Sequence, residues 1–162
     1  MTPTLLESLS HALCDELEAA FGRIQHCVRQ LSDEQIWQPP HPGLNPVGNL
    51  LLHLCGNVKQ FIVSVVGGEA DDRNRPAEFT SREPIPGSDL LHRLEIILER
   101  AKAVIANANA EELCRVRPVR AENWSGIQTL VKSVAHFRGH TQEIIHITRQ
   151  MLGDRYEFAG MK

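Results

Sequence analysis

Residues 45–66 read NPVGNLLLHLCGNVKQFIVSVV, and this stretch decides the expected fold. Apolar residues recur along it every three or four positions, which is the spacing of an amphipathic helix. Asn45 has the side chain of a helix N-cap, Pro46 suits the first helical position, and the two glycines at 67–68 end the pattern. We therefore expect a helix over about residues 46–66. The positions expected to face inward are Val47, Leu51, Leu54, Val58, Phe61 and Val65.

Three further stretches have the same helical period, and no stretch alternates in the manner of a strand. They cover about residues 5–31, 88–108 and 126–152. Two of them open with residues in capping-box spacing, Thr4 with Glu7 and Ser125 with Gln128, and Ser88 is the expected cap of the other. Four amphipathic helices of this length bury their apolar faces by packing as a bundle. The expected fold is therefore all-α, a four-helix bundle forming one domain over residues 1–162.

The links between these helices differ in character. A short helical turn is expected at residues 32–37, followed by a proline-rich segment that cannot continue a helix. Residues 69–87 are polar and contain three prolines. Because a loop of this length is uncommon inside a compact domain, we expect it to pack across the bundle or to carry function. It also allows a crossover, so simple up-and-down order does not follow from the sequence.

Composition and charge exclude several classes of protein. Apolar residues form 42% of the chain and charged residues 23%, which is the balance of a globular protein. The net charge of -3, without a clustered Lys/Arg stripe, argues against a nucleic-acid partner. No run of eighteen apolar residues occurs and no export signal opens the chain, so we expect no membrane span and a cytoplasmic location. The four cysteines form no C-x-x-C pair and are expected to be reduced thiols.

The last predicted helix carries two histidines four residues apart, His136 and His140. This spacing places both rings on one helix face, with β-carbons about 6 Å apart, so both can reach a single ion. The pair is equally compatible with a solvated helix edge or with histidines bonded to backbone carbonyls. Phe137 follows His136, so the H-E-x-x-H motif of metalloproteases is absent.

His53 lies among leucines in the most apolar part of the second helix. Alone, it is more typical of a core histidine with bonded ring nitrogens than of a ligand. In a bundle, however, one histidine on one helix and a pair on another can form a three-nitrogen metal site with open positions for water or substrate. Helical-wheel positions place such a site at one side or end of the bundle. The other histidines, which we do not expect to be ligands, are His11, His26, His41, His92 and His146.

These features together resemble the DinB-like superfamily, which includes the bacillithiol and mycothiol S-transferase-like proteins. Three segments carry the resemblance: NPVGNLLLHLCGN at 45–57, RNRPAEF at 73–79 and HFRGHTQEI at 136–144. The resemblance implies a four-helix bundle with a crossover, often a homodimer, and a divalent ion, commonly nickel or zinc, on His53, His136 and His140. Many members have x-Gly-Gln after the last histidine, where this chain has Thr141-Gln142-Glu143.

The resemblance implies a divalent-metal-dependent enzyme acting on a small-molecule substrate. Transfer of a low-molecular-weight thiol is the first expectation and hydrolysis the second. By helical spacing, Glu143 is the one candidate for proton transfer. It could instead orient a histidine ring, or it could be a solvated charge. We favour the solvated charge. The alternative function is a non-catalytic, metal-binding or dimerising stress-associated helical module.

Aromatic and charged residues in the links have two possible roles. Trp37, Trp124 and residues 73–79 either line a pocket or pack beneath the links. In the second case, Arg73 and Arg75 are expected to pair with Glu78. Cys55, two residues from His53, points about 160° away from it on a helix and is a poor co-ligand.

Overall fold

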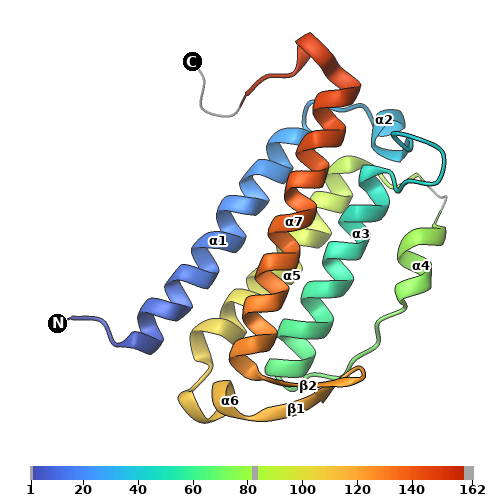
Figure 1. The fold of residues 1–162 in the computed structure, drawn as a ribbon. Helices are drawn as coiled ribbons and strands as arrows, with labels where there is room; N and C mark the ends of the chain where they lie inside the picture. Colours follow the sequence, from blue (N-terminus) through green and yellow to red (C-terminus); the bar gives the residue numbers. More distant parts are fainter. Residues whose placement is uncertain (1, 82–83, 159–162) are drawn as a thin grey trace.

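The computed structural model describes residues 2–81 and 84–158, and four long helices dominate it (Figure 1). They are α1 (Leu5–Val28), α3 (Val47–Val58) with its continuation η1 (Lys59–Val66), α5 (Gly87–Asn107) and α7 (Gly126–Leu152). The links contain α2 (Asp33–Trp37), α4 (Arg75–Thr80), α6 (Ala110–Cys114), β1 (Val116–Val119) and β2 (Glu122–Ser125), and η2 (Gly153–Arg155) follows α7. The predicted four-helix bundle is confirmed.

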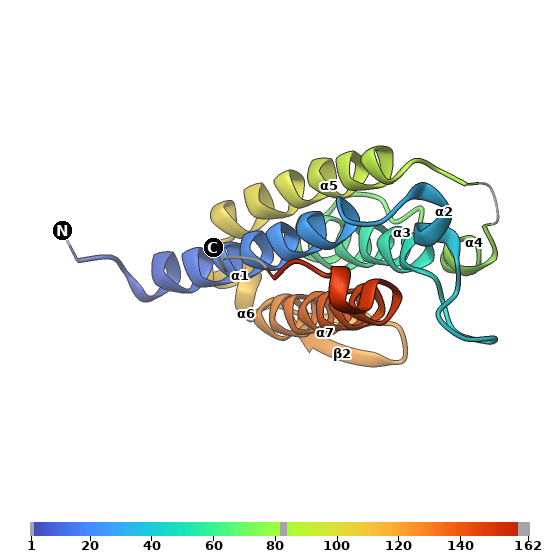
Figure 2. The same ribbon diagram turned by 90° about the horizontal axis from the view of Figure 1, so that it is seen from above.

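The helices do not follow simple up-and-down order. Helix α1 packs against α5 and α7, and α3 packs against the same two helices, so α1 and α3 occupy opposite corners (Figures 1 and 2). Helices α1 and α7 run in one direction and α3 and α5 in the other (Figure 1). Because α3 and α5 are consecutive yet parallel, the chain must return along the bundle between them, and it does so through α4. The predicted crossover is therefore present.

Helix caps agree with the sequence at two helices and differ at the other two. The capping boxes of α1 and α7 form as expected. Asn45 does not cap α3, because the helix begins one residue later, after Pro46, without a side-chain cap. Ser88 does not cap α5 either, because that helix begins at Gly87, whose N–H donates to Oδ1 of Asp33 in α2 at 2.8 Å. A distant side chain has replaced the local cap.

The second long helix changes its winding at Lys59, where η1 takes up π-helical hydrogen bonding. The wider turn rotates the side chains that follow relative to a regular α-helix. Ile62, Val63 and Val66 are buried, whereas Val65, which we expected to face inward, is only half-buried. That expectation was wrong because it assumed 3.6 residues per turn throughout.

A short β-hairpin precedes α7, although no strand was expected. Strands β1 and β2 pair antiparallel, with Val116 opposite Ser125 and Val119 opposite Glu122. Each strand has four residues, too few to show the alternation that indicates a strand in sequence. The hairpin matters because it places Arg120 and Trp124 beside α7.

The core lies between the four long helices and is apolar, with Leu17, Leu51, Leu94 and Phe137 at most 1% exposed. The segment Val47–Val66 is long and apolar enough to cross a membrane, because its most apolar 18-residue window has a mean hydropathy of 1.3. Its most apolar window is 67% buried inside the bundle, as in the core helix of a folded domain.

Candidate metal centre

Three histidines from two helices converge beside the core. His53 projects from α3, and His136 and His140 project from α7, which packs against α3. One ligand atom from each of the three lies within 4.8 Å of the other two. His53 is only 4% exposed, while the other two rings are half-buried. The convergence predicted from the sequence is present, and the pair on α7 faces the single histidine on α3.

The ring of His53 is held by the crossover link. Its Nδ1 lies 2.8 Å from Oε2 of Glu78 in α4 and 3.1 Å from Nη2 of Arg73. The shorter contact is to the carboxylate, which only accepts, so we assign the hydrogen to Nδ1 of His53. Glu78 is itself 8% exposed and forms an ion pair with Arg73, whose Nε is 2.6 Å from Oε1. A hydrogen on Nδ1 leaves Nε2 as the unprotonated nitrogen. Nε2 lies 2.9 Å from Nε2 of His136.

Gly56 makes room for this contact. A β-carbon at position 56 would lie 2.0 Å from Oε1 of Glu78 and 3.0 Å from Nε of Arg73. Only glycine allows the buried pair to approach α3 this closely. The position lies three residues after His53, on the same side of the helix.

His140 is oriented in a similar way from the solvent side. Its Nδ1 lies 2.7 Å from Oε2 of Glu143, one turn further along α7, and the Glu143 side chain is 46% exposed. We favoured a solvated charge at Glu143, but the carboxylate contacts the imidazole. The role of Glu143 in proton transfer stays a prediction.

The three donors suit a divalent ion. Nitrogens bound to one ion at about 2.1 Å lie roughly 3.0–4.2 Å apart, close to the separations seen here. His53 and His136 bring their Nε2 atoms to 2.9 Å, where two lone pairs repel unless a hydrogen or a cation lies between them. Imidazole nitrogens are common ligands of zinc, nickel, copper and iron. The donor set therefore fits a metal without selecting one.

Burial favours the neutral form of His53 and of His136. It lowers the pKa of His53 below the ordinary 6.5, although the hydrogen bond to Glu78 opposes this. Burial also lowers the pKa of His136 to about 4, with further contributions from the positive charges of His140, His53, Arg73 and Arg120. A neutral imidazole offers a lone pair, so the nitrogens of both rings are available at neutral pH.

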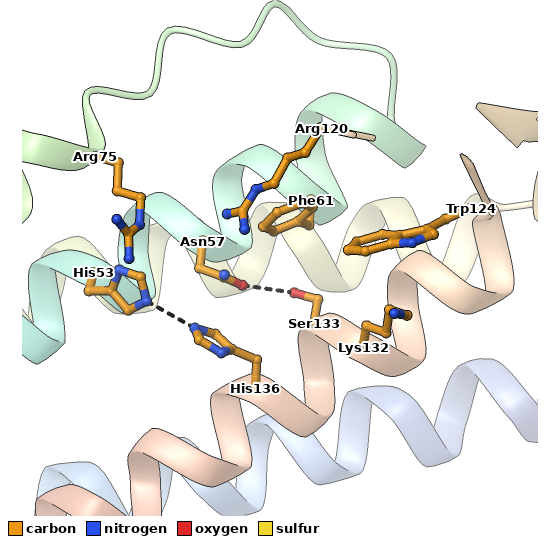
Figure 3. A pocket seen from close by; sticks show the side chains of 9 residues that line it. All are labelled: His53, Asn57, Phe61, Arg75, Arg120, Trp124, Lys132, Ser133 and His136. Carbon is orange, nitrogen blue, oxygen red and sulfur yellow. Dashed lines mark hydrogen bonds between the residues drawn. The ribbon is translucent and has the colours of Figure 1, made fainter. Parts of the chain in front are cut away.

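A cavity of about 230 Å³ opens next to the cluster (Figure 3). His53 and His136 form one end of it. Ser133 Oγ donates to Asn57 Oδ1 at 3.3 Å across its floor. The remaining lining residues are Phe61, Arg75, Arg120, Trp124 and Lys132.

A family profile described as "Protein of unknown function (DUF1572)" matches residues 8–161. The chain belongs to the DUF1572 family. No curated protein matches the sequence.

Solved structures share the fold of this DUF1572 chain. A conserved protein from Enterococcus faecalis has a TM-score of 0.76 at 14% identity, covering 89% of this chain and 97% of its own. A DinB-like protein from Bacillus subtilis has a TM-score of 0.69 at 16% identity, covering 91% of this chain and 96% of its own. YfiT from Bacillus subtilis, described as a probable metal-dependent hydrolase with an unusual four-helix bundle topology, has a TM-score of 0.72 at 18% identity, covering 93% of each. The predicted DinB-like fold is confirmed.

The link residues divide between the two roles that the sequence allowed. Trp124 and Arg75 line the cavity, whereas Trp37 packs beneath a link and donates from Nε1 to the carbonyl of Ile85 at 2.9 Å. Arg73 pairs with Glu78 as expected, but Arg75 instead stacks over the ring of Phe79.

The remaining histidines and cysteines lie outside the cluster of His53, His136 and His140. His26, for example, bonds the carbonyl of Glu157, and His92 lies 3.9 Å from Glu95. All four cysteines are free thiols. Burial raises the pKa of Cys55 to about 12, so it stays protonated and is no ligand or nucleophile at neutral pH.

Several residues of the DUF1572 site were not found from the sequence. Asn57 and Phe61 follow His53 at spacings of four and eight, so their position on its helix face was a usable signal. No sequence signal marked Arg120 or Lys132 as a site residue. The position of Arg120 depends on the hairpin, and that of Lys132 depends on the start of α7.

Proposed function

We propose that this DUF1572 protein is a divalent-metal-dependent enzyme acting on a small molecule, with His53, His136 and His140 as the ligands. One observation carries the proposal: three imidazole donors lie within 4.8 Å of one another, and two of them, His53 and His136, line a cavity of about 230 Å³. Three protein ligands leave at least one position of a four-coordinate ion open, which is the pattern of catalytic rather than structural sites. A closed four-ligand site would have argued for a structural role instead.

The chain's own residues prepare the site. Glu78 fixes the tautomer and the direction of the His53 ring, and Glu143 does the same for His140. Arg73 balances the buried charge of Glu78 and holds the carboxylate in place. Asn57 and Ser133 supply polar groups on the cavity floor, and Phe61 and Trp124 supply an apolar wall.

A divalent ion held there would polarise a carbonyl and lower the pKa of a water or thiol in its open position. The description of YfiT as a probable metal-dependent hydrolase favours hydrolysis as the first reaction to test. We infer zinc or nickel as the first ions to try, because both accept three imidazoles.

Thiol transfer is the second candidate, and the lining of the cavity favours it. The nine lining residues include no carboxylate that could take a proton from water. A thiol, with an ordinary pKa of about 8.5 against about 15.7 for water, needs less help to become a nucleophile. The low-molecular-weight thiol is then a cosubstrate.

Metal titration tests the proposal. Chelator-treated protein is titrated calorimetrically with zinc and with nickel, and we expect one ion per chain. His53→Ala and His140→Ala should each weaken binding severely, whereas His146→Ala, a histidine on α7 outside the cluster, should leave it unchanged. The reloaded protein is then assayed on small esters and amides, and on electrophiles with added thiol. Binding below about 0.1 ion per chain would exclude a metal-dependent enzyme.

A further inference from the structure

The cavity beside the histidines is positively charged, although the chain as a whole carries -3. Arg75, Arg120 and Lys132 line it, and among the residues that the structure describes no aspartate or glutamate does. They come from three separate elements: α4, the turn between β1 and β2, and α7. A concave site lined by one sign of charge concentrates ligands of the opposite sign.

The two arginines are positioned by aromatic rings rather than by ion pairs. Arg75 lies over the Phe79 ring at 5.1 Å and Arg120 lies over the Phe61 ring at 4.9 Å. Stacking on a ring fixes the plane of a guanidinium while its N–H edge stays available to a ligand. Within residues 2–81 and 84–158, neither arginine forms an ion pair with a carboxylate. Figure 3 shows Arg75 directed toward His53, and Arg120 extended over Phe61 toward Asn57.

Nearby negative charges are already engaged. Glu78 is paired with the buried Arg73. Glu122 accepts from Nε1 of Trp124 at 2.8 Å and lies 4.0 Å from Nζ of Lys132. Lys132 is therefore partly balanced, and Arg75 and Arg120 carry the free positive charge of the cavity.

Arg120 occupies a backbone conformation that favours glycine. Its φ is +57°, and it is the one non-glycine residue with positive φ in the part of the chain that the structure describes. An ordinary L-residue there costs roughly 1 kcal/mol or more relative to glycine. Arg120 is exposed, and its guanidinium lies over Phe61 at the cavity, so this strained position points to a role in binding rather than in folding.

We infer that the substrate carries a small oxyanion, a carboxylate or a phosphate, which binds Arg75 and Arg120 while its reacting bond lies at the histidine end. The inference rests on the proposed function and adds the substrate class to it. A cavity of about 230 Å³ is smaller than the roughly 300–1,000 Å³ typical of sites for drug-sized ligands, so the substrate is small. Phe61 and Trp124 provide the wall against which its apolar part packs.

Binding of matched probes to metal-free protein tests this inference. Benzoate and phenyl phosphate are compared with neutral benzamide by calorimetric titration in the presence of chelator. We expect each anion to bind at least about tenfold more tightly than benzamide, with a preference that weakens as salt screens the charges. The two anions together show whether the site favours carboxylate or phosphate.

Variants identify the residues responsible. Arg75→Gln with Arg120→Gln should remove the preference for anions, whereas Arg23→Gln, at an exposed arginine on α1, should keep it. Arg120→Gly separates binding from folding, because glycine relieves the positive φ. We expect this variant to unfold at the same or a higher temperature than the parent while binding anions several-fold more weakly.

Three results would overturn the inference: binding of both anions no tighter than that of benzamide, no measurable binding of either anion, or a preference that survives loss of both arginines. Because these titrations contain no metal, their failure is separate from failure of the metal titration. A protein that binds zinc but shows no anion preference would keep the proposed function and lose this substrate class.

Discussion

Glu78 connects the three-histidine cluster to the rest of the fold. It bonds His53 through one oxygen and Arg73 through both, and its backbone carbonyl accepts from Asn49 at 2.7 Å. All three partners are at least partly buried. The carboxylate therefore both orients a ligand and anchors α4 to α3.

Replacing Glu78 with Gln should weaken metal binding and destabilise the fold together. Loss of the acceptor that orients a metal-bound histidine typically costs about 10–100-fold in affinity. Leaving the Arg73 guanidinium buried without its partner should lower the free energy of unfolding by about 3 kcal/mol. Calorimetric metal titration and urea denaturation of the metal-free protein measure the two effects.

Glu143→Gln is the matched control. Its carboxylate also bonds a histidine of the cluster, but its side chain is 46% exposed and holds no buried cation. We expect a loss of affinity with less than about 1 kcal/mol change in unfolding free energy. Equal destabilisation by the two substitutions would contradict the role given to Glu78.

The low pKa of His136 predicts how stability changes with pH. The unfolded chain binds a proton at this residue below about pH 6.5, whereas the folded protein does so only below about pH 4. Metal-free protein should therefore lose stability as pH falls from 7 to 5. His136→Ala should make that loss smaller, as measured by urea midpoints, while His146→Ala should leave it as in the parent. An identical pH dependence in His136→Ala would refute the assignment.

Sequence spacing was enough to group the three histidines but not to find what surrounds them. His136 and His140 share a face by their spacing of four, and His53 stands out among leucines. Glu78 lies 25 residues from His53, on a link whose path no periodicity describes. Gly56 was a usable sign, because a glycine one turn after His53 indicates that something approaches the helix closely.

At the scale of elements, the long helices were predictable and the departures from regularity were not. Residues 61–66 are nearly all apolar, so their pattern cannot distinguish a π-helix from an α-helix. The hairpin turn at Arg120 and Ala121 lacks the Asn-Gly or Asp-Gly that marks such turns. Both missed features border the cavity, where Phe61 and Arg120 face each other.

Two glycines on α7 should respond oppositely to alanine. A β-carbon at Gly126 would lie 2.6 Å from the Glu112 carbonyl and 2.9 Å from Cα of Leu113, which are backbone atoms. Gly126→Ala should therefore lower the free energy of unfolding by about 1–3 kcal/mol. Gly139 has nothing within 4 Å, so Gly139→Ala should raise it by about 0.5–1 kcal/mol through helix propensity. Urea denaturation checks both, and destabilisation by Gly139→Ala would contradict the open space at that position.

At the scale of the whole molecule, the crossover makes the site possible. It places α3 beside α7, so residues 83 positions apart in sequence meet at 2.9 Å. It also carries α4 along the outside of α3, which buries His53 beneath Glu78. The apolar core lies between the four helices and consists of residues outside the cluster, so we expect the bundle to fold without metal.

Metal binding should consequently stabilise a protein that is already folded. An ion that binds the native state alone adds about 2.7 kcal/mol when its concentration is 100 times the Kd. For a chain of this size that corresponds to a rise in Tm of roughly 5–10 °C. Thermal unfolding followed by circular dichroism should show this rise in the parent and in His146→Ala, and not in His53→Ala. A chain that unfolds when the ion is removed would contradict this account.

The cytoplasmic location, the homodimer and the absence of nucleic-acid and membrane partners remain predictions from the sequence. Sedimentation of the purified protein tests the homodimer, for which a mass of twice 18.2 kDa is expected. A mass of one chain would exclude it.

X-ray absorption at the metal edge of reloaded protein tests the central claim most directly. If His53, His136 and His140 hold one ion, the spectrum should show three imidazole nitrogens at about 2.0–2.1 Å and at least one further light-atom ligand. His53→Ala should reduce the imidazole count or abolish binding. Sulfur ligands, or an unchanged spectrum in His53→Ala, would show that the ion binds elsewhere.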